Sequence, residues 1–403
     1  MVGQEVVLDI GPVAHGGSCV ARSDGRVVFV RHTLPGEKVR ARITDGTATS
    51  RFLRADAVQI LQASEQRRTP PCPWSGPGRC GGCDWQHTSA EYGRELKTAV
   101  VAEQLQRLAG IEWDGQVEQI TGDEDGLRWR TRVELATDDH GRAGFRAHRS
   151  HEIVPVQDCV ISVPQVGATG IFTETFPPQV TGVDVAVSTD ESATAVLLPH
   201  RAEVPSVLEQ VVVGGTTLDF EVSARGFWQV HPGAAPTFVA EVLRGLAPQP
   251  GESVLDLYCG VGLFTRFLAG AVGTQGTVLG IEGDARAVAD AQPALKETPQ
   301  AHIERADVRY AAPLVERHLG SHADLVVLDP PRTGAGREVI GQVVALAPRA
   351  IAYVACDPSA LARDIAYAAE LGYAMTSLRA FDAFPMTHHV ECIAILAPVG
   401  DPT

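Results

Sequence analysis

Long hydrophobic runs are missing from this sequence. No stretch of about 18 consecutive apolar residues occurs, so no membrane-spanning helix is expected. The amino-terminal segment MVGQEVVLDIGPVAHGG lacks the basic stretch and apolar run of a secretory signal peptide. We therefore expect a cytoplasmic protein, whose eight cysteines are reduced, metal-bound or catalytic rather than paired in disulfides.

Positive charge is also scarce. The chain has 34 lysine and arginine residues against 49 aspartate and glutamate residues, for a formal net charge of −15. This balance argues against a protein that coats nucleic acid non-specifically. It is compatible with an enzyme that acts on RNA, because charge can be distributed unevenly among domains. The length of 403 residues, 44% of them hydrophobic, predicts two or three domains.

The pattern of the sequence changes twice along the chain. Residues 1–64 alternate in short segments separated by turn signals, which predicts a small β-barrel of a type that often binds oligonucleotides. Residues 65–225 predict a central, β-rich domain with one helix at 89–109, which we expect to pack on the carboxy-terminal domain. Residues 226–403 alternate strands with helices, which predicts a doubly wound, mostly parallel α/β sheet.

A glycine turn follows the first strand of the carboxy-terminal domain. That strand contains Asp256 and leads to Gly260 and Gly262, where glycine lets a ligand approach the backbone near a helix N-terminus. Glu282 ends the next strand, where a carboxylate can accept hydrogen bonds from both hydroxyls of a ribose. Asp307 follows at a position suited to bind an adenine amino group. Together these residues predict a cleft for S-adenosylmethionine.

A nicotinamide or flavin site is the alternative interpretation of this turn. Such a site requires the pattern G-x-G-x-x-G, but Thr265 occupies the third glycine position. The acidic strand residue Asp256 favours S-adenosylmethionine instead. Asp256 and Glu282 could each be structural, as a cap and as a solvated strand end. Their joint occurrence at this spacing favours the cofactor site.

Two later strands of the same domain also end in polar residues. Asp329 and Cys356 stand at the carboxyl ends of strands, where open α/β sheets place their ligands. A cysteine exposed at this edge is a candidate covalent nucleophile. The role of a small buried hydrophobe fits Cys259 and Cys392 better.

A thiol nucleophile of this kind needs a partner base. A thiolate that adds to carbon 6 of uracil makes carbon 5 nucleophilic, and a base must later remove the proton from carbon 5. Glu391 opens a strand that should lie beside the strand of Cys356, which makes it the candidate base. His388 and His389 are rivals for this role, although their pattern favours hydrogen-bonded loop histidines over a catalytic base.

Four motifs resemble the RNA uracil-5-methyltransferase family, which makes 5-methyluridine in transfer or ribosomal RNA. They are DLYCGVGLFT, DPPR, the strand-end Cys-Asp-Pro and HVE. Residues 1–62 are similar to the TRAM domain, an RNA-binding domain often fused to these enzymes. The resemblance implies a class I methyltransferase fold, S-adenosylmethionine as cofactor and RNA as partner. Nothing in the sequence indicates an obligate protein partner.

The same resemblance implies roles for individual residues. Cys356 would be the nucleophile, and Glu391 would be the base that takes the proton from carbon 5. The implied cofactor contacts are Gln229, Tyr258, Glu282 and Asp329. Two positions depart from the family pattern: His231 stands where asparagine is usual, and Asp357 follows the nucleophile where asparagine is common.

Four further cysteines form a candidate metal site: Cys72, Cys80, Cys83 and Cys159. Four thiolates suffice for an iron–sulfur cluster or a structural zinc, and the spacing alone does not choose between them. Ribosomal-type members of the resembled family carry a 4Fe–4S cluster on C-x5-C-G-G-C plus a distant cysteine. Here the first gap is two residues longer. We favour a 4Fe–4S cluster, with structural zinc as the alternative.

Two other functions remain open at this stage. An amino-group methyltransferase acting on adenine or guanine would place an aromatic residue after Asp-Pro-Pro, but Arg332 stands there. A non-catalytic RNA-binding protein would have lost a reacting residue, yet both candidates are present. Three aromatic residues could stack on RNA or pack in the core: Trp85, Trp129 and Phe145.

Overall fold

The computed structural model describes residues 1–200 and 202–400, and its largest element is an eight-stranded sheet. The strand order is β16-β15-β14-β17-β18-β20-β19-β6. The strands from β16 to β18 run parallel, while β20 is antiparallel to both β18 and β19. Their bounds are β14 Ser253–Leu257, β15 Thr277–Glu282, β16 Ala301–Arg305, β17 Leu325–Leu328, β18 Ala350–Ala355, β19 Tyr373–Asp382, β20 Glu391–Pro398 and β6 Val117–Gln119. This confirms the predicted doubly wound α/β fold.

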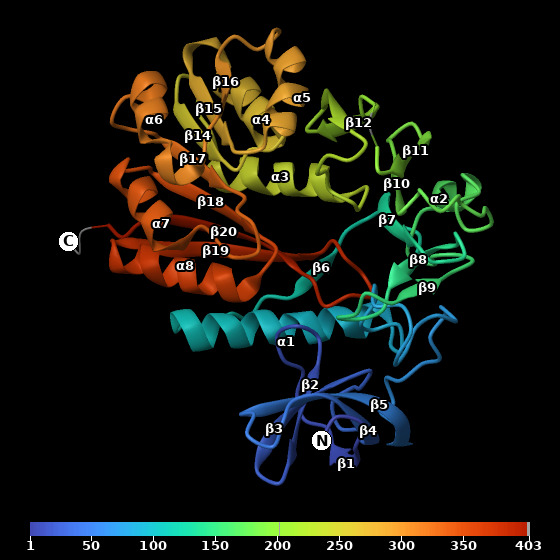
Figure 1. Ribbon diagram of the computed structural model, residues 1–403. Helices are drawn as coiled ribbons and strands as arrows, with labels where there is room; N and C mark the ends of the chain where they lie inside the picture. Colours follow the sequence, from blue (N-terminus) through green and yellow to red (C-terminus); the bar gives the residue numbers. More distant parts are fainter. Residues whose placement is uncertain (201, 401–403) are drawn as a thin grey trace.

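Helices cover both faces of this sheet (Figure 1). Successive strand residues point to opposite faces, so Val254 and Val327 pack in one apolar cluster while Leu255 and Val326 pack in the other. Burial on both faces explains why these strands read as continuous apolar runs. The helical segments are α3 Ala234–Leu246, α4 Leu263–Val272, η1 Gly273–Gln275, α5 Ala285–Leu295, η2 Val308–Tyr310, α6 Ala312–Leu319, α7 Gly336–Ala345 and α8 Pro358–Glu370.

The amino-terminal part is a separate five-stranded sheet in the order β1-β4-β5-β3-β2. It encloses its own apolar core, and β4 buries every second residue. The strands are β1 Glu5–Asp9, β2 Cys19–Ser23, β3 Arg26–Arg31, β4 Lys38–Asp45 and β5 Phe52–Gln62. They lie within residues 1–64, where the alternating pattern predicts short strands, and the small β-barrel is confirmed.

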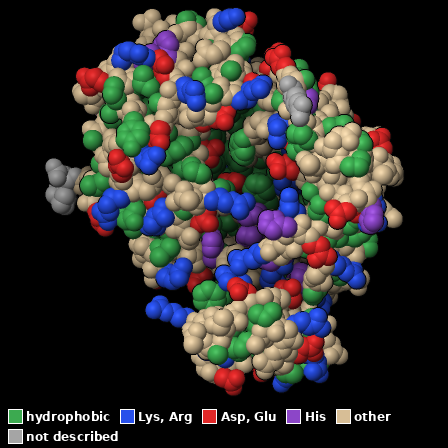
Figure 2. All heavy atoms as spheres, in the orientation of Figure 1, with side chains coloured by type: hydrophobic (Ala, Val, Ile, Leu, Met, Phe, Trp, Pro, Cys, Tyr) green, Lys and Arg blue, Asp and Glu red, His purple; other side chains and the backbone are tan. Residues whose placement is uncertain are grey.

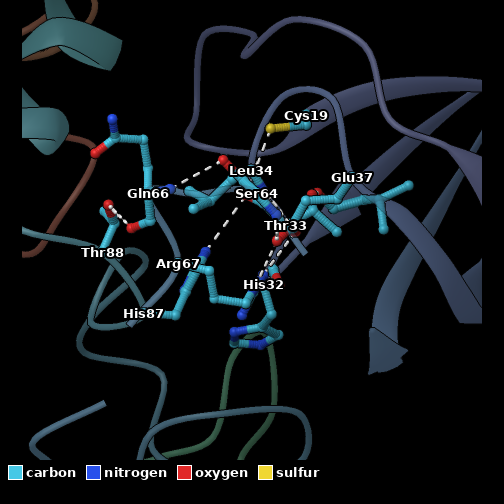
Figure 3. A network of polar contacts seen from close by, with 11 residues as sticks. Cys19, His32, Thr33, Leu34, Glu37, Ser64, Gln66, Arg67, His87 and Thr88 are labelled. Atoms are coloured by element: carbon cyan, nitrogen blue, oxygen red, sulfur yellow. Dashed lines mark hydrogen bonds and ion pairs between the residues drawn. The ribbon is translucent and has the colours of Figure 1, made fainter. Parts of the chain in front are cut away.

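A polar network fastens the segment after β5 to this barrel (Figure 3). Arg67 donates to both carboxylate oxygens of Glu37, at 2.5 and 2.7 Å, and to the backbone oxygen of His32 at 2.8 Å. The Glu37 side chain is buried and also accepts from the backbone nitrogen of Leu34. The chain is therefore held against the barrel where it leaves β5.

Helix α1, Ala90–Ala109, lies between the barrel and the large sheet (Figure 1). Leu96 and Val100 pack in the barrel core, whereas Val101 and Leu105 pack in a core of the large sheet. The next strand, β6, is the edge strand of the large sheet and runs parallel to β19. Both α1 and β6 belong to residues 65–225, which the sequence pattern assigns to a central domain. In the structure they pack on the barrel and on the large sheet, so the boundary at residue 225 follows the order of the chain and not the packing.

The central part contributes a smaller sheet in the order β11-β10-β7-β8-β9 and a hairpin of β12 and β13. Its elements are β7 Arg132–Thr137, β8 Ala143–Arg146, β9 Ile153–Pro155, α2 Pro164–Ala168, β10 Gly182–Val187, β11 Ala193–Leu198, β12 Ser206–Val213 and β13 Thr216–Ser223. In the part of the chain that the structure describes, no helix has the length and apolar character needed to cross a membrane.

Candidate active site

The turn after β14 has a backbone that glycine makes possible. Tyr258 has φ 64°, and Gly260 and Gly262 have φ 56° and 84°, all in the left-handed region. A Cβ atom on Gly262 would stand 2.7 Å from Cδ1 of Ile303, so the site also lacks space for a side chain. The backbone nitrogen of Gly260 donates to the Glu282 carboxylate at 2.9 Å. The turn and the acidic strand end are thus one connected unit.

Asp256 lies beneath this turn and is fully buried. One carboxylate oxygen accepts from the hydroxyl of Thr265 at 2.5 Å, while the other has no hydrogen-bond partner among the described residues. Burial, with a contribution from the charge of Glu282, raises the pKa of Asp256 to about 7. Thr265, which stands where a dinucleotide site would have glycine, therefore supports Asp256.

A cavity of about 370 Å³ opens at the ends of β14, β15 and β16. Tyr258, Glu282 and Asp307 line it, which brings three of the predicted cofactor residues together. Asp307 forms an ion pair with Arg309 at 2.6 Å, which lowers the pKa of Asp307 and keeps it ionised. Gln229 is buried and lines a different cavity of about 250 Å³. Gln229 is therefore not among the residues that line the first cavity.

The second half of the site is formed by β17, β18 and β20. Ala355 pairs with Cys392 in the antiparallel register of β18 and β20, so continuing the register by one residue sets Cys356 opposite Glu391. Asp329 follows β17, and its backbone nitrogen donates to the Leu257 oxygen of β14. This arrangement brings Cys356, Glu391 and Asp329 to one edge of the sheet.

These three acidic groups suppress one another's ionisation. Burial, followed by the charges of Glu391 and Asp329, raises the pKa of Cys356 to about 12, against the opposing effect of Arg332. Burial and the charge of Asp329 raise the pKa of Glu391 well above its usual range. Burial together with nearby carboxylates raises the pKa of Asp329 to about 7. This environment therefore favours the protonated forms of Cys356 and Glu391 in the free protein.

The two histidines before Glu391 are engaged elsewhere. The Nδ1 atom of His388 lies 2.6 Å from the Asp84 carboxylate, whose other oxygen faces Arg31 of the barrel at 3.5 Å. The Nε2 atom of His389 lies 3.2 Å from the Arg332 guanidinium. Burial and the neighbouring cations lower the pKa of His389 to about 3. Both behave as hydrogen-bonded loop histidines, which leaves Glu391 as the candidate base.

A buried ion pair holds the loop that carries these residues. Lys97 of α1 donates to the Asp382 carboxylate at 2.5 Å and to the backbone oxygen of Phe384 at 3.0 Å. Both charged side chains are almost completely buried. The loop that leads to Glu391 is therefore anchored by a helix almost 300 residues earlier in the chain.

Most of the other residues that the sequence singles out are buried. Cys259 and Cys392 are buried. Trp85 and Trp129 are also buried, and Phe145 packs against the core of the central sheet, so in this structure these aromatics serve packing. His231 is buried and stacks on Trp129 with ring centroids 5.9 Å apart.

The four clustered cysteines are free thiols in one region of the central part. Burial raises the pKa of Cys80 to about 11, and the charge of Cys159 adds to this effect. The same charge contributes to the raised pKa values of Cys72 and Cys83. Within residues 1–200 and 202–400, however, no three histidine, cysteine or acidic side chains converge closely enough to hold a single metal ion.

Three supporting residues have no signal in the sequence. Asp84 stands beside a cysteine and contacts His388, Lys97 lies in the middle of a helix, and His15 lies in a loop of the barrel. His15 contacts Asp357, the residue after the candidate nucleophile, at 3.0 Å. Each contact joins segments far apart in sequence, so no local spacing could reveal it. The sequence shows that Asp357 departs from the family pattern, but it does not indicate that His15 is the partner of Asp357.

Comparison with known proteins matches both ends of the chain to family profiles. Residues 1–58 match the TRAM domain, and residues 202–398 match tRNA (Uracil-5-)-methyltransferase. The chain is 46% identical to an uncharacterized RNA methyltransferase of Streptomyces avermitilis, over 99% of each protein. It is 33% identical to the 23S rRNA (uracil(1939)-C(5))-methyltransferase RlmD of Pseudomonas aeruginosa, over 98% of this chain and 94% of the relative.

A solved structure shares the whole architecture. The Pyrococcus abyssi tRNA (uracil-54, C5)-methyltransferase in complex with S-adenosyl-L-homocysteine superposes with a TM-score of 0.71 at 21% identity. The match covers 96% of this chain and 98% of the Pyrococcus chain. At this identity the likeness shows a common fold, from the barrel to the large sheet.

Proposed function

The chain belongs to the S-adenosylmethionine-dependent RNA uracil-5-methyltransferases, and on that premise we propose that Cys356 and Glu391 carry the reaction through a covalent protein–RNA adduct. The observation that supports this most is the register of β18 and β20, which sets the two side chains opposite each other. Family membership decides against an amino-group methyltransferase and against a non-catalytic RNA-binding protein.

In the proposed reaction, the Cys356 sulfur bonds to carbon 6 of the uracil ring, and the electrons of the 5,6 double bond move to an enolate. Carbon 5 would then bond to the methyl group of bound S-adenosylmethionine as the methyl–sulfur bond breaks, with neutral S-adenosylhomocysteine as the leaving group. Glu391 takes the proton from carbon 5, the 5,6 double bond re-forms, and the thiolate leaves. The environment that raises the pKa of Glu391 also makes its carboxylate a stronger base once it is ionised.

The residues at the strand ends fit S-adenosylmethionine. Glu282 is placed for ribose hydroxyls and Asp307 for the adenine amino group, in the cavity that they share with Tyr258. Asp256 has an unpartnered buried oxygen, and Asp329 stands between this cavity and Cys356 in strand order. A sulfonium cation near these carboxylates would favour their ionised forms, because opposite charge lowers a carboxyl pKa.

A ribosomal RNA is the substrate we favour. The relative named for 23S rRNA is 33% identical over 98% of the chain, whereas the structure named for tRNA is 21% identical. The target uridine must leave its stack to reach Cys356 at the sheet edge. Figure 2 shows a hollow in this face of the molecule, with histidine and basic side chains gathered between the hollow and the barrel. A cytoplasmic location would bring the enzyme to this RNA.

A 4Fe–4S cluster on Cys72, Cys80, Cys83 and Cys159 completes the proposal. The charges of Cys159, Cys80 and Cys72 contribute to the raised pKa of Cys83, so the four thiols lie in one region. Four thiolates suffice for a cluster, and the resemblance to the ribosomal-type members favours a cluster over structural zinc. Anaerobically purified protein should contain iron and absorb broadly near about 400 nm. Zinc without iron would overturn this assignment.

The test of the catalytic proposal is covalent trapping. The protein is mixed with S-adenosylmethionine and a 23S rRNA fragment or tRNA that contains 5-fluorouridine, and denaturing electrophoresis follows. Fluorine cannot be removed as a proton, so the adduct should persist. A band that forms with rRNA and disappears in Cys356→Ala is the expected result. No band with either RNA from protein that binds S-adenosylmethionine would refute the proposal, and a band with tRNA alone would correct the substrate.

A further inference from the structure

The loop between β1 and β2 of the barrel reaches into the catalytic half. Its tip is ordered by two backbone hydrogen bonds between Ala14 and the next residues: Ala14 donates to the Ser18 oxygen at 2.8 Å, and Gly17 donates to the Ala14 oxygen at 3.1 Å. Gly16 and Gly17 both have positive φ. His15 therefore projects from a tight turn rather than from a loose segment.

The tip contacts both reacting loops of the catalytic sheet. His15 Nε2 lies 3.0 Å from the carboxylate of Asp357. Two residues later, a Cβ atom on Gly17 would stand 2.6 Å from Cβ of His388, so the backbone touches the loop that leads to Glu391. The Gly17 oxygen also accepts from the indole nitrogen of Trp85 at 3.0 Å.

Asp357 has two tasks that meet at its carboxylate. One oxygen caps helix α8 by accepting from the backbone nitrogens of Ser359 and Ala360 at 3.0 and 2.9 Å. The other oxygen faces His15. Because Asp357 directly follows Cys356, its side chain fixes the turn from which the thiol projects. Its negative charge also opposes ionisation of that thiol.

His15 offsets this charge. The hydrogen bond to Asp357 raises the pKa of His15, and Glu103 of α1 adds to the effect while Arg107 opposes it. The charged groups that face Cys356 are Glu391, Asp329, Arg332 and Asp357. A cation beside Asp357 offsets one of the three carboxylate charges that raise the pKa of Cys356. It does so without occupying the uracil site.

We propose that His15 is a positioning residue of the methyl-transfer reaction, through which the TRAM barrel holds the Cys356 turn and neutralises Asp357. The inference rests on the proposed role of Cys356 as nucleophile. It assigns the barrel a part in chemistry in addition to RNA capture.

The test compares the rate of adduct formation at saturating 5-fluorouridine RNA in His15→Ala, Asp357→Asn and the double variant. His15→Ala should lower this rate about tenfold, which corresponds to loss of one charge-assisted contact, while RNA affinity changes by less than about twofold. In the His15→Ala background, Asp357→Asn should restore most of the rate, because asparagine still caps α8 but carries no charge. Asp357→Asn alone should lose less than His15→Ala.

His322→Ala is the matched control, because His322 pairs with Asp324 at 3.1 Å far from the thiol. It should leave the rate unchanged. If wild-type protein forms no adduct, the proposed function fails. If wild type reacts but His15→Ala reacts equally fast, or loses only RNA affinity, the positioning role is wrong. If the rate reduction in the double variant equalled the product of the two single-variant reductions, the positioning role would also be contradicted.

Discussion

The two halves of the candidate site are built in different ways. The cofactor half uses consecutive strand ends, in which Glu282 bonds the Gly260 turn and Asp307 caps the helix that follows its own strand. The reacting half uses strands from the end of the chain and is supported by α1 and the barrel. The half of the site that is built from local motifs can be recognised in the sequence. For the half that is assembled from distant segments, the sequence reveals only the candidate reacting groups.

The largest effect should come from the nucleophile itself. Cys356→Ala should reduce methyl transfer to RNA by at least about 10⁴-fold, because loss of a covalent nucleophile removes the reaction path. The measurement is transfer of a labelled methyl group from S-adenosylmethionine. Cys19→Ala is a matched control, since Cys19 is a buried thiol of the barrel core. Equal losses in both variants would mean that the assay reports folding and not chemistry.

Loss of the buried ion pair between α1 and the loop that leads to Glu391 should lower the stability of the fold. Lys97→Met leaves Asp382 buried without its partner, so the free energy of unfolding should fall by about 3–5 kcal/mol. Denaturant unfolding measures this change. Lys97→Met combined with Asp382→Asn should recover part of the loss, because no charge is left unpaired. A loss below about 1 kcal/mol in the single variant would remove α1 from the support of the reacting half.

Glu391→Gln separates the two steps proposed for Cys356 and Glu391. The proposed nucleophile is kept and the proposed base is lost, so turnover should fall by about a hundredfold. A methylated protein–RNA adduct should accumulate with ordinary uridine. Mass spectrometry of the denatured complex detects it, with wild-type protein as the comparison. Normal turnover in this variant would assign the base elsewhere.

A further effect concerns pH and the cofactor half. An unfolded aspartate titrates near about pH 4, whereas folded Asp256 titrates at about 7. Its raised pKa therefore contributes stability that is full below about pH 4 and is lost as pH rises through about 7. The slope is about 1.4 kcal/mol per pH unit for one group. Asp256→Asn should flatten this decline between pH 5 and about 7; an unchanged slope would place the titration on another group.

Much of the fold could be read from the sequence because each element is patterned locally. The barrel strands alternate, and the sheet strands are apolar because both of their faces are covered. The three cofactor residues that share a cavity follow strand ends for the same reason. Gln229 was assigned by resemblance alone and lies in another cavity. The supports His15, Asp84 and Lys97 depend on packing between segments that no single motif spans.

Cys356 and Glu391 are proposed to act on one uracil ring from the neighbouring strands β18 and β20. The most direct measurement is peptide mapping of the adduct that wild-type protein forms with 5-fluorouridine RNA and S-adenosylmethionine. We expect a nucleotide attached to the peptide that contains Cys356, with an additional methyl group on its uracil. Attachment to any other peptide, or an adduct without the methyl group, would contradict it.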